Sequence, residues 1–218
     1  MPFFFGERQG DRVELTGADA RHLAQSLRAR PGELISVVDP RGRLLGVRLD
    51  TVSPSLVGGR VETDVEHRSE PQRAVIMAAA MLPAQSLELV LSRCTEAGAA
   101  GFLLVQAERS VARGAKPERW ATICREAAML AGRLRVPEVG GPLPFPDAWT
   151  AAASPCLLDR EASVALPAGG DELTLFVGPE GGWSDAERRL AGERRFTLGP
   201  RTLRADTAAL VALALALG

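Results

Sequence analysis

The stretch LTLFVGPEGGWSDAERR, residues 173 to 189, decides the fold. An apolar run of strand character leads into a turn with three glycines, and Ser184 and Glu187 then form the S-x-x-E pattern that caps a helix. This order is typical of α/β proteins, in which ligands bind beyond the carboxyl ends of parallel strands. The stretch therefore predicts either a ligand-binding turn, where glycines let the backbone approach a ligand, or an ordinary tight connection.

The glycine spacing excludes two common phosphate-binding motifs. It does not match G-x-G-x-x-G, and the Lys and Ser/Thr of a P-loop are absent. A second turn lies in FTLGPRTLRADTAALVALALALG, residues 196 to 218, where a short strand meets Gly199 and a basic turn. Two such turns in one parallel sheet would form a pocket together. Asp206 is then either a carboxylate of that pocket or the cap of the last helix.

Segments of strand and helix character alternate from residue 73 to the end of the sequence. This alternation predicts a parallel sheet covered by helices on both faces. Gly98 and Pro117 mark helix ends. The final apolar helix is shorter than the roughly 20 residues that cross a bilayer, so we expect it to pack on the sheet or on a second subunit.

The first 68 residues have a different pattern, with short strands separated by turns. Asp39-Pro40-Arg41-Gly42 is a hairpin turn signal, and ADARHLAQSLR, residues 18 to 28, has the spacing of one amphipathic helix. The polar, proline-bearing stretch EHRSEPQ, residues 66 to 72, indicates a linker between two domains. We predict a small β-barrel over residues 1–68 and an α/β domain over residues 73–218.

Composition limits the classes of function. The net charge is −1, which argues against a generally basic nucleic-acid binder. Only Lys116 among the 26 basic residues is lysine; this bias reflects either genome composition or phosphate binding by arginine. The three cysteines are widely spaced, so we expect buried thiols and no metal site. No export signal or apolar span is present, which predicts a soluble, cytoplasmic protein that does not enter a membrane.

The motifs GPEGGWSDAE and LGPRTLRADTAAL, residues 178–187 and 198–210, closely resemble those of the ribosomal RNA small subunit methyltransferase E family, within the SPOUT superfamily. MPFFF, HLAQSLRARPGE and LVLSRCTEAGAAGFLLVQAERSV extend the resemblance over nearly the whole chain. It implies an α/β fold with a trefoil-knotted SPOUT domain at the C-terminus and a PUA-like β-barrel at the N-terminus. It also implies a homodimer that uses S-adenosylmethionine to methylate N3 of a uridine in the decoding region of 16S ribosomal RNA.

The resemblance also assigns a cofactor pocket. Its residues would be Leu157, Leu158, Phe176, Gly178, Pro179, Gly181, Gly182, Leu198, Gly199 and Leu203. The sulfonium methyl is already activated, so alignment is the main task of the protein. The uracil N3 must also lose a proton, for which Asp206 or Glu180 is our candidate acceptor, and Arg204 is our candidate to stabilise the developing charge. Alternatively, Glu180 only braces its loop and Arg204 only grips phosphate.

Basic side chains near helix and strand ends are candidates for RNA contacts, although each is an ordinary solvated side chain in the alternative interpretation. The candidates are Arg21, His22, Arg28, Arg109, Arg113 and Arg133. The target uridine must be unpaired or flipped out, because its N3 is hidden in a duplex. The resemblance implies 16S ribosomal RNA as the substrate, and we expect the enzyme to meet it on a partly assembled small subunit.

The chain departs from the family pattern at several positions. Met129 and Leu130 stand where a Glu-Gln pair is usual, and Asp206 replaces a usual Glu. Loss of a polar pair that faces the pocket would weaken recognition of the nucleobase. In the alternative interpretation, this loss marks a divergent branch with the same substrate. The intact glycine turns and Arg204 favour an active uridine-N3 methyltransferase, which is the main hypothesis. The alternatives are a non-catalytic RNA-binding or assembly protein, and a knotted methyltransferase that acts on transfer RNA.

Overall fold

The computed structural model describes residues 2–166 and 172–218. The chain forms two compact units, Met1–Glu70 with Ala128–Arg135, and Pro71–Ala127 with Val136–Gly218. The sequence did not indicate that Ala128–Arg135 belongs with the first unit. The reason is tertiary: the Phe3 amide donates to the Met129 carbonyl at 3.0 Å, and the Met129 side chain joins the hydrophobic core of that unit.

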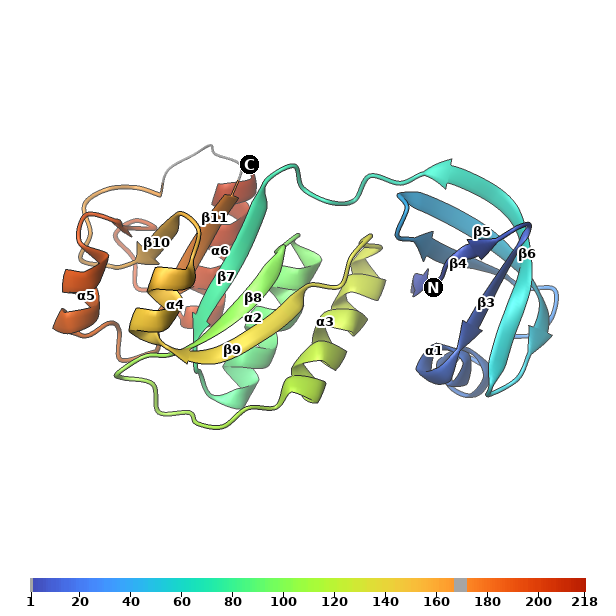
Figure 1. The fold of residues 1–218 in the computed structure, drawn as a ribbon, viewed down its shortest axis with the longest axis horizontal. Helices are drawn as coiled ribbons and strands as arrows, with labels where there is room; N and C mark the ends of the chain where they lie inside the picture. Colours follow the sequence, from blue (N-terminus) through green and yellow to red (C-terminus); the bar gives the residue numbers. More distant parts are fainter. Residues whose placement is uncertain (1, 167–171) are drawn as a thin grey trace. The chain divides into compact units, whose positions relative to one another are not determined.

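The first unit is built on one six-stranded sheet (Figure 1). Its strands are β1 (Phe4–Phe5), β2 (Arg8–Gln9), β3 (Arg12–Thr16), β4 (Leu34–Asp39), β5 (Arg43–Val52) and β6 (Leu56–Glu66). The order is β1-β4-β5-β6-β3-β2, so β1 and β2 are the edge strands, and the described strands make a half-barrel rather than the closed barrel we expected. The predicted hairpin turn is confirmed: Gly42, with φ 85°, donates to the Asp39 carbonyl between β4 and β5.

The helix of the first unit differs from the single amphipathic helix we predicted. Helix α1 (Gly17–Arg21) passes directly into one π-helical turn, η1 (His22–Ser26). Ala20, Leu23 and Leu27 have the spacing of one helix face, but only Ala20 and Leu23 of the three are buried, and Leu27 is 39% exposed. The wider i to i+5 turn rotates the following residue away from the face that an α-helix would present.

A buried ion pair ties residues 128–135 into the first unit. Arg133 is 3% exposed and its guanidinium pairs with the Glu70 carboxylate, which also accepts from the Leu134 amide at 2.8 Å. Burial acts to raise the pKa of Glu70, but the bonds from Arg133 and the backbone amides outweigh it and lower the pKa below its ordinary value. The predicted RNA contact at Arg133 is therefore wrong, because its charge is already neutralised inside the unit.

The second unit has the predicted parallel sheet, in the order β12-β10-β11-β7-β8-β9. Its strands are β7 (Ala74–Ala80), β8 (Gly101–Gln106), β9 (Glu138–Pro144), β10 (Pro155–Leu158), β11 (Glu172–Val177) and β12 (Arg195–Phe196). The central strands β7 and β11 are almost continuously buried, as is typical of strands covered on both faces. Strand β9 was not predicted, because its Gly and Pro residues break the apolar pattern.

In the part of the second unit that the structure describes, five helices accompany this sheet: α2 (Ala84–Glu96), α3 (Pro117–Ala131), α4 (Phe145–Ala151), α5 (Asp185–Ala191) and α6 (Ala205–Leu217). The last residues of α3, from Ala128 on, belong to the first unit. Helices α2 and α6 pack against each other and on the sheet, behind the strands in Figure 1, while α4 lies in front of them. The expected packing of α6 on the sheet is confirmed. Gly98, with φ 105°, follows α2 and Pro117 opens α3, also as predicted, whereas α4 was missed.

The three cysteines are buried thiols, as expected. Burial raises the pKa of Cys94 to about 12 and that of Cys156 to about 11.

Among residues 2–166 and 172–218, no helix is long and apolar enough to span a membrane. Within the same ranges, no group of three His, Cys, Asp or Glu side chains is arranged to hold a metal ion.

Candidate functional site

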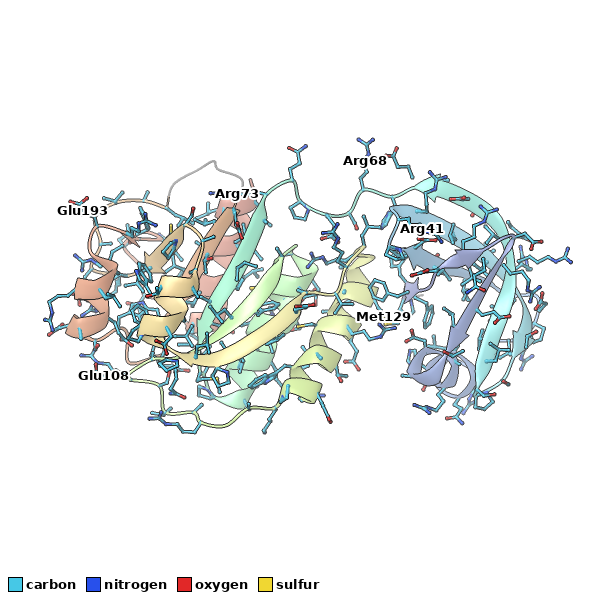
Figure 2. All side chains as sticks on the ribbon, viewed as in Figure 1. Arg41, Arg68, Arg73, Glu108, Met129 and Glu193 are labelled. Carbon is cyan, nitrogen blue, oxygen red and sulfur yellow. The ribbon has the colours of Figure 1, made fainter. Side chains whose placement is uncertain are left out.

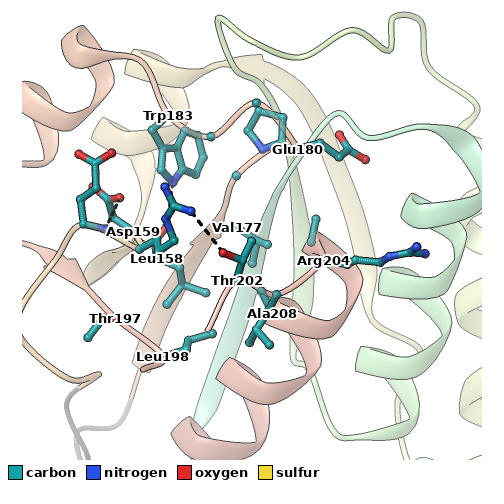
Figure 3. Close-up of a pocket in the computed structure, with 18 of the residues that line it drawn as sticks. Leu158, Asp159, Val177, Glu180, Trp183, Thr197, Leu198, Thr202, Arg204 and Ala208 are labelled. Atoms are coloured by element: carbon teal, nitrogen blue, oxygen red, sulfur yellow. Dashed lines mark hydrogen bonds between the residues drawn. The ribbon is translucent and has the colours of Figure 1, made fainter. Parts of the chain in front are cut away.

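A cavity of about 720 Å³ opens at the carboxyl ends of β10 and β11 in the second unit (Figure 3). Three segments form most of its wall: residues 158–161 at the end of β10, residues 177–183 at the end of β11, and residues 196–199 and 201–205, which lead into α6. The volume lies within the roughly 300 to 1,000 Å³ of typical small-molecule sites. Both turns singled out in the sequence therefore close around one cavity, as the pocket hypothesis required.

The glycine turn after β11 needs its glycines for two reasons. Gly182 has φ 67°, a left-handed conformation that side chains with a Cβ rarely adopt, and its amide donates to the Pro179 carbonyl at 2.8 Å. A Cβ on Gly178 would lie 3.0 Å from the Trp183 ring. The turn thus packs against its own tryptophan, and helix α5 follows with the predicted capping box of Ser184 and Glu187.

Most residues predicted to bind the cofactor do line the cavity. These are Leu158, Gly178, Pro179, Gly181, Gly182, Leu198, Gly199 and Leu203. Leu157 and Phe176 do not: both are fully buried in the hydrophobic core of the second unit. Neighbouring side chains of a strand point to opposite faces, so a residue next to a wall position can belong to the core.

Sequence reasoning missed a charged network at one side of the cavity. Asp159 is 5% exposed, and its carboxylate accepts from Arg188 Nε at 3.1 Å and from Arg195 Nη1 at 3.4 Å. Arg188 also contacts Glu161 at 3.2 Å. The available signal was an acid directly after the apolar strand PCLL, where the carboxyl end of a parallel strand places it at the ligand edge.

The three candidate catalytic residues have different positions. Glu180 and Arg204 are exposed residues that line the cavity, and in Figure 3 both side chains extend to the same side, away from Asp159. Asp206 is half-buried in the first turn of α6 and is not among the described lining residues. It is not the helix cap either, because Arg204 occupies the N-cap position and no side chain caps this end.

The remaining RNA candidates are exposed in their own units. Arg21, His22 and Arg28 lie on or beside the helical segment of the first unit. Arg109 and Arg113 lie in the long loop between β8 and α3 of the second unit. Arg109 has an additional contact: its Nη1 donates to the Gly181 carbonyl at 3.0 Å, so it also lines the cavity.

The position of Met129 in the structure bears on one departure from the family pattern, the replacement of the usual Glu-Gln pair by Met129 and Leu130. Met129, which is labelled in Figure 2, lies near the end of α3. It is 8% exposed and packs in the core of the first unit. Leu130, its neighbour, is 64% exposed. Neither side chain is among the described residues that line the cavity, so this departure does not alter the cavity wall.

Known proteins resemble this chain along nearly its full length. Residues 68–217 match the family described as RNA methyltransferase domain. Ribosomal RNA small subunit methyltransferase E of Mycobacterium tuberculosis is 34% identical over 218 residues, which cover 90% of this chain and 82% of that protein. The protein of the same name from Bacillus subtilis is 33% identical over 224 residues, covering 91% and 87%.

Solved structures agree with this match. The ribosomal RNA small subunit methyltransferase E of Neisseria gonorrhoeae, bound to S-adenosyl methionine, superposes with a TM-score of 0.89 at 26% identity and covers 98% of this chain and 95% of that one. A putative methyltransferase from Legionella pneumophila, in complex with the same cofactor, gives a TM-score of 0.87 at 26% identity, with coverage of 98% and 94%.

The parallel sheet, the cavity at its strand ends and the matched family together define an RNA methyltransferase. More narrowly, the chain belongs to the ribosomal RNA small subunit methyltransferase E family. The resemblance drawn from the motifs after β11 and before α6 is thereby confirmed.

Proposed function

We propose that this chain methylates N3 of a uridine in the decoding region of 16S ribosomal RNA, with S-adenosylmethionine as methyl donor. The observation that carries the proposal is the cavity at the ends of β10 and β11, with Glu180 and Arg204 in its wall. Family membership supports the methyltransferase class, and two similar structures hold the same cofactor.

The cavity suits this cofactor by size and by the character of its wall. Leu158, Leu198 and Leu203 offer apolar surface, and the glycine turn offers backbone amides and carbonyls without side chains in the way. When bound, S-adenosylmethionine supplies a methyl group activated by the sulfonium. The protein then has to hold the attacking nitrogen in line with it, and such alignment contributes about 7 to 11 kcal/mol in favourable cases.

Two side chains of the cavity wall are suited to the chemistry at uracil. The N3 proton must be removed, and the Glu180 carboxylate is the acceptor that the geometry favours, since Asp206 is not among the described lining residues. The Arg204 guanidinium, exposed at the start of α6, is suited to stabilise negative charge on the carbonyl oxygens that flank N3.

We place the RNA on basic side chains of both units, with the uridine unpaired or flipped out of its helix. The phosphate contacts would come from Arg21, His22 and Arg28 of a PUA-like first unit and from Arg109 and Arg113 of the second.

We further infer a homodimer, a trefoil knot in the second unit and a cytoplasmic location on an assembling small subunit. Similarity to the methyltransferase E family supports these inferences.

The test is mass spectrometry of 16S ribosomal RNA from a strain that lacks the gene. We expect 3-methyluridine to disappear from the decoding region, and to return with the wild-type gene but not with an R204A variant. Unchanged modification in the deletion strain would reject the proposal in favour of a non-catalytic assembly protein. Loss of a methyl group from transfer RNA instead would assign a different RNA target.

A further inference from the structure

Glu187 makes one hydrogen bond more than a helix cap requires. Its Oε2 accepts from the Ser184 amide at 2.8 Å, which completes the capping box of α5. Its Oε1 accepts from the Glu108 amide at 2.9 Å, and Glu108 lies in the loop after β8, where Figure 2 labels it. Glu187 is 6% exposed, so the bond from Ser184 is buried, and the bond from Glu108 is partly buried because Glu108 is an exposed residue. Both bonds are charge-assisted.

A second bond joins the same two segments, and the loop after β8 again supplies the donor. Arg109, next to Glu108 in the loop after β8, donates from Nη1 to the Gly181 carbonyl at 3.0 Å. The glycine turn after β11 is therefore held against this loop at two points. One lies at its glycines and the other at the start of α5, where Glu187 also binds the Ser184 amide.

The position of the turn decides the shape of the cavity. Gly181, Gly182 and Trp183 line it, and so does Arg109, whereas Glu187 is not among the described lining residues. The turn has no regular ladder of backbone bonds to hold it, since it follows the last residue of β11, Val177. Side-chain bonds to neighbouring segments therefore contribute to its rigidity.

We propose that Glu187 is a positioning residue of the methyl-donor site. By joining the glycine turn to the loop after β8, it sets the shape of the cavity for S-adenosylmethionine without touching the cofactor. This proposal rests on the cofactor of the proposed function and is independent of the RNA position that is methylated.

The isosteric variant E187Q separates this role from simple capping. A glutamine amide has one acceptor oxygen, and its NH2 group would face the second backbone N–H without forming a bond, so one of the two segments is released. The matched control is S184A. It removes the acceptor of the Glu187 amide, at 3.3 Å, but leaves both carboxylate bonds in place.

The experiment is calorimetry of the full chain with S-adenosylmethionine. We expect E187Q to weaken binding roughly 10- to 100-fold, the effect of losing one charge-assisted hydrogen bond. S184A should lower the melting temperature but keep the affinity within about twofold, because a lost cap affects the helix and not the loop. Steady-state rates should show a raised KM for the cofactor with kcat largely retained at saturation.

Wild-type affinity in a folded E187Q protein would overturn the positioning role. Absence of binding by the wild-type chain would instead reject the proposed cofactor. If E187Q does not fold, hydrogen exchange of the wild-type protein tests whether Glu187 holds the loop after β8. The Glu108 amide should exchange slowly, in the same opening event as the Ser184 amide, and fast exchange of Glu108 would also overturn the proposal.

Discussion

The indole nitrogen of Trp183 donates a hydrogen bond to the Leu158 carbonyl at 2.9 Å. This bond joins the turn after β11 to the end of β10, and both residues line the cavity. Trp183 is 2% exposed and packs against Phe145 with ring centroids 5.1 Å apart. One buried tryptophan thus fixes two of the three segments that form the cavity wall.

The variant W183F should therefore lower both stability and cofactor affinity. It removes the indole donor and leaves the Leu158 carbonyl without its bond, which costs about 1 to 3 kcal/mol. The measurements are thermal melting and calorimetry with S-adenosylmethionine. W149F is the control, because Trp149 packs on Phe145 and Phe176 but is not among the described lining residues. Equal cofactor affinity in W183F and W149F would contradict the role of the Trp183 bond.

Substitution of the two candidate catalytic residues should lower kcat with little change in cofactor affinity. We expect a loss of roughly 100- to 1,000-fold for R204A, as for removal of one charge-stabilising donor, and of roughly 100- to 10,000-fold for E180Q, as for removal of a general base. The assay is formation of 3-methyluridine on undermodified small-subunit RNA. D206N is the control and should retain activity. A large loss in D206N with an active E180Q would reverse the assignment of the proton acceptor.

The exposed arginines of the first unit should contribute to RNA binding through phosphate. R21A and R28A should each weaken binding and reduce the slope of log affinity against log salt by about 0.7, the value for one lost contact on a single strand. Titrations of an RNA fragment at several salt concentrations test this. R48A is the control, since Arg48 is already paired with Glu62 at 2.8 Å. A wild-type salt slope in both R21A and R28A would exclude phosphate contacts there.

The ion pair of Glu70 and Arg133 should make stability depend on pH. The pKa of Glu70 is lowered in the folded chain, so its contribution is full above the ordinary glutamate pKa of about 4.3 and is lost as the pH falls towards the folded value. E70Q should be less stable than the wild type at neutral pH, by less than the roughly 3 to 5 kcal/mol of a fully buried pair, because the Glu70 side chain is 22% exposed.

Urea unfolding of both proteins between pH 7 and pH 3 measures this difference. The two free energies of unfolding should converge as the pH falls, because the wild-type carboxylate becomes protonated and then resembles the amide of E70Q. A gap that stays constant over the whole range would show that Glu70 contributes no charge-dependent stability.

The predictions that succeeded depend on neighbours in the sequence. The turn at Asp39 to Gly42, the cap formed by Ser184 and Glu187, and the Pro117 start of α3 each depend on a few consecutive residues. The predictions that failed depend on packing between distant segments. Arg133 is buried because it pairs with Glu70, which lies 63 residues earlier in the sequence. Strand β9 forms despite its glycines and prolines because it pairs in parallel with β8.

The sequence by itself determined the alternation of strands and helices, the two glycine-bearing turns and the family motifs, because periodicity and turn chemistry act over short distances. Only the tertiary structure decided which of these residues meet. Leu157 and Phe176 are buried in the core, and Asp206 is not among the described residues that line the cavity. The Glu187 carboxylate accepts a hydrogen bond from the loop after β8. Side-chain direction and long-range hydrogen bonds depend on how strands stack in space, which no local pattern contains.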